Sequence, residues 1–186
     1  MVAQRLWRIF IMATTTKAAQ AATKGLAELF VDGLKDIYYA EKKILKALPK
    51  MAKGADGKDV SAAFEKHTIE TKEQITRLER VFDQLGERSG GKTCPAIDGI
   101  LEEGEEILAE YKGSPALDAG LVAAAQAVEH YEIARYGALI AWAEQLGHSE
   151  AAELLTVTLG EEMATDEALA ELSDGGVNER AVAEAA

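Results

Sequence analysis

The chain has 186 residues, of which 48% are hydrophobic and 3 are Pro, and it carries a formal net charge of -12. This length suits one domain with an ample core, and the acidic balance argues against nucleic acid and anionic membranes as partners. The lone Cys94 excludes an intramolecular disulfide and a cysteine-based zinc site. A core rich in Ala, Leu, Ile and Val predicts an all-α fold.

The first residues do not fit the pattern of the rest. Residues 1–22 contain Arg5 and Arg8 but no acid, and Met12 offers an alternative start. The stretch is too short to span a membrane and lacks a signal-peptide cleavage site. We expect a disordered arm or an over-extended reading frame there, a domain at 23–173 and a cytoplasmic protein.

Two long helices are predicted first, at 24–53 and 59–85, separated by the turn Gly54–Asp59. Pro49 is expected to kink or fray the end of the first, and Asp59 or Ser61 to cap the second. Spacings of three and four residues place one face of each helix inward. The first face contains Phe30, Leu34, Ile37, Glu41, Ile44, Leu45 and Leu48, and the second contains Val60, Phe64, His67, Thr71, Gln74 and Leu78.

A Gly-rich loop at 86–96 leads to a short helix at 96–111. Two further long helices follow, at 115–146 and 150–172, and Ser149 is expected to cap the last one. Two helical hairpins joined by a long crossover are typical of a ferritin-like antiparallel four-helix bundle, here with an extra short helix in the crossover. Residues 174–186 are expected to form a flexible tail.

Acidic residues interrupt the apolar face of all four long helices. Unpaired buried anions are costly, and a pair of metal cations is the usual remedy in such a bundle. Carboxylates mixed with imidazole suit iron or manganese. The candidate ligands are Glu41, His67, Glu70, Glu129, Glu132, Glu162 and Asp166.

The ligand pattern departs from the Glu-x-x-His motif of di-iron bundles. His67 precedes Glu70 instead of following it, and the last helix offers Glu162 and Asp166 without a His. His67 and Asp166 suit either direct ligation or orientation of a neighbouring ligand. Glu161 competes with Glu162, and the apolar face favours Glu162.

Other chemically active side chains have simpler interpretations. His130 suits packing or an interface, and His148 a structural role in a turn. Cys94 is expected to be a small buried side chain rather than a redox group. Aromatic packing is the first interpretation for three tyrosines, with hydrogen bonds to site carboxylates as the alternative; these are Tyr38, Tyr131 and Tyr136.

Several segments resemble the YciF/YciE-type bacterial ferritin-like family: DIYYAEKKILKALPKMA, EKHTIETKEQITRLERVF, CPAIDGILEEGEEIL, AAAQAVEHYEIARYGALIAWAEQLGH and TLGEEMATDEAL. The resemblance covers residues 25–173 and implies a ferritin-like bundle, a dimer, a di-metal site and a link to stress responses. It also implies that all seven candidate ligands are motif residues of the family. Gly160 stands where such proteins often have an acid.

The leading hypothesis is a di-metal stress-response protein that holds two ions, with iron favoured over manganese, and oxidises Fe(II) with oxygen or peroxide. Glu70 or Glu132 is a candidate bridging ligand. The alternatives are a non-enzymatic structural or interaction protein with a vestigial or weak metal site, and a dimanganese catalase-like activity. The sequence does not decide whether the protein is an enzyme. A homodimer is expected, with Trp142, Tyr131 and helix 96–111 as candidate interface elements.

Overall fold

The computed structural model describes residues 23–183, so the expected N-terminal arm lies outside the described residues. Within this range the chain is helical and contains no strand, which confirms the all-α prediction. The long helices are α1 (Leu26–Gly54), α2 (Lys58–Leu85), α3 (Pro95–Glu110), α4 (Leu117–Gln145) and α5 (Ser149–Leu172). A π-helical turn, Ser173–Val177, leads into the short α6 (Asn178–Ala183).

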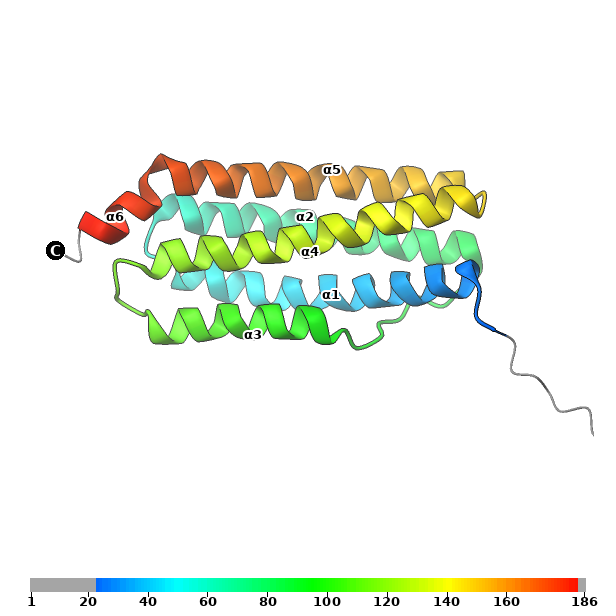
Figure 1. Ribbon diagram of the computed structural model, residues 1–186, viewed down its shortest axis with the longest axis horizontal. Helices are drawn as coiled ribbons and strands as arrows, with labels where there is room; N and C mark the ends of the chain where they lie inside the picture. Colours follow the sequence, from blue (N-terminus) through cyan, green and yellow to red (C-terminus); the bar gives the residue numbers. More distant parts are fainter. Residues whose placement is uncertain (1–22, 184–186) are drawn as a thin grey trace, which may run out of the picture.

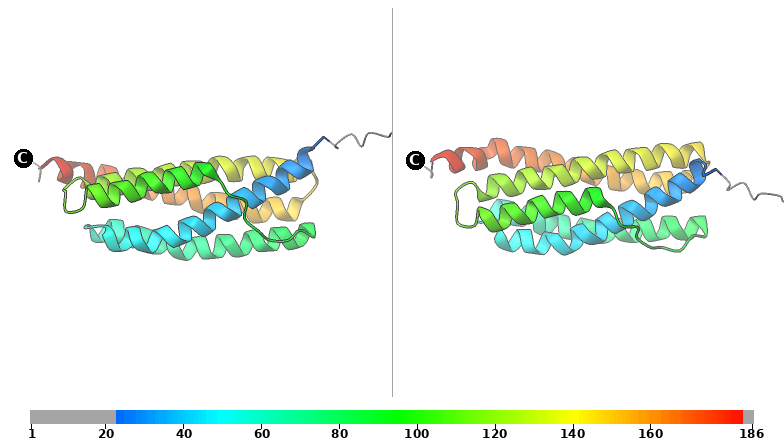
Figure 2. Two further views of the ribbon diagram at one scale, coloured as in Figure 1. Left: turned by 90° about the horizontal axis from the view of Figure 1, so that it is seen from below. Right: turned by 60° about the horizontal axis from the view of Figure 1, so that its bottom comes forward.

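The helices form the predicted bundle of two hairpins. Helices α1 and α2 make one hairpin and α4 and α5 the other, and all four run side by side (Figure 1). Helix α3 packs outside the bundle against α1 and α4 (Figure 2). The arrangement places the middles of the four bundle helices at one level, where the acidic residues lie.

The connection between α2 and α3 is an extended segment that crosses α1 (Figure 2). The backbone N–H of Lys92 donates to the carbonyl oxygen of Lys35 at 2.9 Å. A Cβ atom at Gly91 would come within 3.0 Å of the Tyr39 Cβ, so glycine permits this close approach. The crossover is therefore fixed to the first hairpin before α3 begins.

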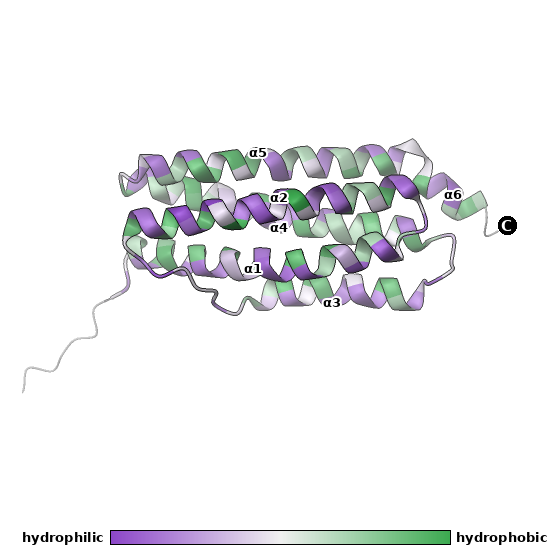
Figure 3. Ribbon diagram, turned by 180° about the vertical axis from the view of Figure 1, so that it is seen from behind, coloured by the Kyte–Doolittle hydropathy of each residue, from purple (hydrophilic) through white to green (hydrophobic). Residues whose placement is uncertain are grey.

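Each long helix has an inward face, and hydrophilic and hydrophobic stretches alternate along the ribbons (Figure 3). On α1 the buried face includes Phe30, Leu34, Ile37 and Ile44, each at most 2% exposed. Burying a side chain of this size stabilises the fold by about 1.5–3 kcal/mol. This apolar packing above and below the acidic level supports the burial of the acids.

The helix starts differ from the predictions. Neither Asp59 nor Ser61 caps α2, which begins after Gly57. Instead, the carboxylate of Asp118 in α4 accepts hydrogen bonds from the backbone N–H groups of Asp56 and Gly57 at 2.9 and 2.7 Å. A residue of the second hairpin thus satisfies free donors at the α1–α2 turn.

Ser149 is also not a cap, because α5 begins after His148 without a side-chain hydrogen bond. The helix ends follow the expected chemistry more closely. Gly86 follows the end of α2 with a φ of 68°, and Gly147 follows the end of α4 with a φ of 77°. Both angles lie in the left-handed region, which favours glycine. Helix α1 continues past Pro49 to Gly54.

The residues after α5 differ from the expected tail. The chain turns at Gly176, where φ is 108°, and Val177 is only 3% exposed before α6 begins. One buried apolar side chain therefore holds this segment against the bundle. No helix in the described part of the chain is long and apolar enough to cross a membrane.

Candidate metal centre

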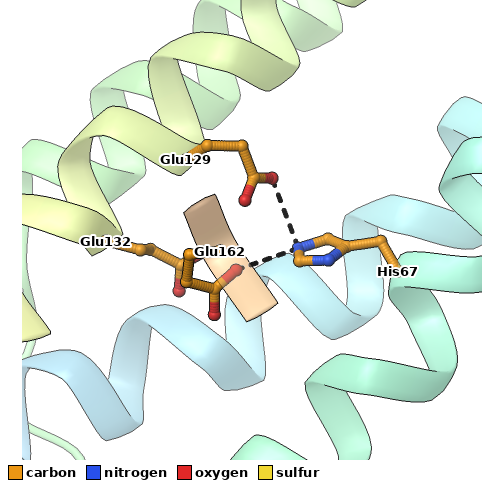
Figure 4. A group of neighbouring side chains, drawn as sticks. All are labelled: His67, Glu129, Glu132 and Glu162. Carbon is orange, nitrogen blue, oxygen red and sulfur yellow. Dashed lines mark ion pairs between the residues drawn. The ribbon is translucent and has the colours of Figure 1, made fainter. Parts of the chain in front are cut away.

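Four buried side chains from three helices converge in the core: His67 of α2, Glu129 and Glu132 of α4, and Glu162 of α5 (Figure 4). One ligand atom from each lies within 4.8 Å of the others. The Nε2 atom of His67 lies 3.4 Å from Glu129 Oε1 and 3.9 Å from Glu162 Oε2. These atoms surround a space in which a cation could be bound.

Helical spacing explains why these side chains point to one place. Glu129 and Glu132 are three residues apart and therefore share the inward face of α4. Glu162 occupies the same face of α5 as the buried Thr158 and Leu169. The acids of α4 and α5 thus reach the centre through the same helical periodicity that builds the core.

Glu41 of α1 is completely buried beside this group. The Tyr136 hydroxyl of α4 donates a hydrogen bond to Glu41 Oε1, while Glu41 Oε2 has no partner in the described residues. Burial first, and then the negative charge of Glu162, raises the pKa of Glu41. Glu41 therefore supplies a further oxygen next to the four-residue cluster.

Unsatisfied polar atoms gather at this level of the bundle. Buried polar atoms normally find a hydrogen-bond partner, and an unpaired one carries the cost of its lost hydration. Each of the seven predicted ligands has at least one buried side-chain atom without a partner in the described part of the chain: Glu41, His67, Glu70, Glu129, Glu132, Glu162 and Asp166. Bound cations would satisfy the oxygen and nitrogen atoms that point into the centre, so the donor set fits metal binding.

The carboxyl groups favour their neutral forms when no cation is present. Burial, together with nearby negative charge, raises the pKa of Glu129 to about 8. Burial is also the main cause that raises the pKa values of Glu41, Glu132 and Glu162 well above the usual range. Protons can therefore occupy the positions that a metal would take, and metal binding must displace them.

Burial and the neighbouring carboxylates shift the pKa of His67 in opposite directions. Burial lowers its pKa, but the neighbouring carboxylates of Glu70, Glu162 and Glu41 outweigh burial, and the pKa is raised overall. The pKa of Glu70 is lowered, first by His67 and then by Lys66. Without a metal, the raised pKa favours the protonated form of His67, whereas a bound metal would take its neutral imidazole as a ligand.

Glu70 and Asp166 lie at the rim of the centre. Glu70 forms an ion pair with Lys66 at 2.7 Å, and its side chain is 22% exposed. Asp166 lies 3.1 Å from the exposed His130, and its side chain is 25% exposed. His130 therefore contacts the rim of the site rather than packing in the core. Of the seven candidates, five are in the interior and these two face the solvent side.

Residues 25–182 match the profile of a domain of unknown function, DUF892. The chain belongs to the DUF892 family. It is 42% identical to the protein YciF of Escherichia coli K12 over 159 residues, which is 85% of this chain and 96% of YciF.

Solved structures of similar proteins have the same fold. The crystal structure of the E. coli stress protein YciF matches with a TM-score of 0.80 and 41% identity, covering 84% of this chain and 99% of YciF. YcfI from Rhodopseudomonas palustris matches with a TM-score of 0.77 and 49% identity, covering 81% of this chain and 96% of YcfI. These similarities confirm the YciF-type resemblance and the helical-bundle fold.

One part of this DUF892 site was missed in the sequence. Arg77 of α2 donates to Glu161 of α5 at 2.7 Å and to Thr158 at 3.1 Å, and Gln74 also donates to Glu161 at 3.2 Å. This network separates the two adjacent acids of α5, because Glu161 pairs with Arg77 while Glu162 points into the core. The sequence signal for this network was Arg77, which follows the polar residues on the inward face of α2.

The three tyrosines and Cys94 divide between the site and the periphery. Only Tyr136 reaches a buried site carboxylate, as its alternative interpretation allowed. Tyr38 donates to Glu79 at 2.7 Å instead. Cys94 is 1% exposed, as predicted, and its sulfur lies 3.1 Å from the Tyr131 hydroxyl. His148 stacks against Phe30, with ring centroids 6.0 Å apart, in agreement with a structural role.

Proposed function

We propose that this DUF892 protein binds two metal ions, iron in preference to manganese, and uses them to oxidise Fe(II) with oxygen or peroxide. The observation that carries the proposal is the convergence of His67, Glu129, Glu132 and Glu162 within 4.8 Å, with buried oxygen and nitrogen atoms that lack partners in the described chain. Such an arrangement is costly unless a cation binds it.

Charge balance supports two ions rather than one. Glu41, Glu129, Glu132 and Glu162 are each at most 2% exposed. When all four are ionised, they carry four negative charges, which two divalent cations would neutralise. The neutral imidazole of His67 adds a donor without changing this balance. Carboxylate-rich sites with one imidazole suit iron and manganese better than softer metals.

The protein's own residues would have distinct roles around the ions. Bound iron would supply the electrons for reducing oxygen or peroxide. Tyr136 fixes the orientation of Glu41 by donating to one of its oxygens. The ion pair between Arg77 and Glu161 holds α2 and α5 together beside Glu162. Glu70 and Asp166, at the rim, are placed to receive incoming cations and to exchange protons with water.

Metal content is the direct test. We expect about two ions per chain, as in di-iron bundles, when protein purified without added metal is loaded with Fe(II) anaerobically and then exposed to air. Mass spectrometry gives the stoichiometry, and an oxo-bridged diferric absorption band identifies the oxidised product. Substoichiometric metal under both conditions would refute the proposal. Peroxide disproportionation with manganese but not iron would favour the catalase-like alternative.

Two variants make this test specific. Glu129→Ala removes a buried ligand and is expected to reduce metal occupancy strongly. Glu153→Ala, on the exposed side of α5, removes the same charge without touching the centre and should leave occupancy unchanged. Equal occupancy in wild type and Glu129→Ala would remove Glu129 from the ligand set.

A role in the stress response is part of this proposal, and it is supported by similarity to the E. coli stress protein YciF. The family resemblance also supports a homodimer. A cytoplasmic location suits a protein whose single cysteine, Cys94, forms no intramolecular disulfide.

A further inference from the structure

An apolar cavity of about 70 Å³ adjoins the candidate metal centre. All five long helices contribute to its walls, and much of the lining is aliphatic, with Ile44, Leu48, Leu121 and Leu169 among the larger side chains. Polar groups lie where the cavity meets the centre, at His67, Glu129 and Thr165. The cavity thus connects apolar space to two members of the buried ligand cluster.

Small side chains create this space. The bundle places alanines at several lining positions and glycine at 104, where larger residues would fill the volume. A cavity of about 150 Å³ lined by Leu, Ile and Phe stays dry and binds benzene or xenon. At about half that volume, the present cavity suits guests smaller than benzene.

The cavity reaches the surface between α2 and α5. Lys66 and Ala168 line it and are both exposed. The ammonium group of Lys66 is held 2.7 Å from Glu70 Oε1 at this side of the centre. The side chain of Lys66 is 62% exposed, so this end of the cavity lies next to solvent.

We infer that this cavity binds dioxygen and guides it to the metal centre, and that dioxygen rather than hydrogen peroxide is the oxidant. Dioxygen is small and apolar and loses little by leaving water. Hydrogen peroxide carries two hydroxyl groups, and the aliphatic side chains that form most of the lining offer no partners for them. The polar lining side chains are Lys66, His67, Glu70, Glu129 and Thr165. The inference rests on the proposed function and deepens it by choosing between the two oxidants.

Xenon binding to the metal-free, full-length protein tests the cavity independently of any reaction. Xenon is an apolar probe that enters such cavities. We expect saturable chemical-shift changes by xenon NMR at the methyl groups of lining residues such as Ile44 and Leu121. Absence of xenon binding would overturn the inference. Because metal content is measured separately, this failure differs from failure of the metal-site proposal.

Gly104→Ala narrows the cavity with little strain. A Cβ at Gly104 would lie 3.6 Å from both the Ala124 Cβ and the Met51 Cε, which are ordinary contacts with two lining residues. Gly99→Ala is the matched control, because it changes the same helix but its Cβ would meet nothing within 4 Å. We expect xenon affinity to fall several-fold in Gly104→Ala only.

Oxidation rates then test the choice of oxidant. With Fe(II) bound, Gly104→Ala should slow the reaction with dioxygen several-fold, and Gly99→Ala should not. Thr165→Val removes the hydroxyl of a lining side chain whose Oγ1 atom has no partner in the described chain. Faster oxidation by peroxide than by dioxygen, or a peroxide reaction that depends on the Thr165 hydroxyl, would overturn the inference.

Discussion

The metal-free protein should lose stability as the pH rises from 5 to 8. The pKa of Glu129 is raised from an ordinary value of 4.5 to about 8, first by burial. Between these values the folded protein retains a proton that the unfolded chain has released. The free energy of unfolding therefore falls by about 1.4 kcal/mol per pH unit for this proton. From pH 5 to 8 the loss is roughly 4 kcal/mol from Glu129 alone.

The neighbouring groups act in the same direction. The raised pKa values of Glu41, Glu132 and Glu162 also favour the folded state at low pH and lose this benefit as the pH rises. The raised pKa of His67 has the same sign above its ordinary value of 6.5. These four groups add to the decline caused by Glu129, whereas the lowered pKa of Glu70 acts in the opposite direction near its ordinary value of 4.5.

Urea unfolding of chelator-treated protein at several pH values measures this effect. Glu129→Gln removes one titrating group and should flatten the profile by roughly 4 kcal/mol between pH 5 and 8. Glu153→Gln, on an exposed position of α5, should follow wild type. Manganese at 100 times its dissociation constant should restore about 2.7 kcal/mol at pH 8. A wild-type profile that is flat or rises over this range would refute the argument.

Three further results are expected. Tyr136→Phe leaves Glu41 without its hydrogen-bond donor, and should lower the free energy of unfolding in urea by about 1–3 kcal/mol. It should also weaken manganese binding, measured by metal titration. Asp118→Ala removes the acceptor for two backbone N–H groups at the α1–α2 turn and should cost about 1–2 kcal/mol in urea unfolding, while Asp59→Ala costs much less. Light scattering after size-exclusion chromatography should give twice the 19.9 kDa chain mass, and a single-chain mass would contradict the expected homodimer.

Much of the correct interpretation of the sequence depended on the helical spacing of apolar residues. Phe30, Leu34, Ile37 and Ile44 fall at helical spacing and are buried together, and Glu41 lies among them because it shares their face. The same reasoning placed His67 and the acids of α4 and α5 inward. A charged residue on an apolar face is a local signal, so it can be recognised without knowledge of the tertiary structure.

Features that depend on contacts between hairpins were not predictable in this way. Asp118 satisfies the α1–α2 turn from α4, so no residue near the start of α2 indicates it. The pairing of Arg77 with Glu161 likewise joins two helices that are distant in sequence. Helix α6 depends on the burial of Val177 after two glycines, a signal too short to separate from a tail.

The division of the ligands between the two hairpins has a consequence for the order of folding. Glu41 and His67 belong to the first hairpin, and Glu129, Glu132 and Glu162 to the second. Contacts between hairpins close the longest loops and form late. In the metal-free chain that last step also buries acids that must take up protons as they come together, so it should be slower at neutral pH. Cations that neutralise these acids should accelerate docking of the two hairpins. The supply of metal would then determine how fast the bundle assembles as well as whether the folded protein holds metal.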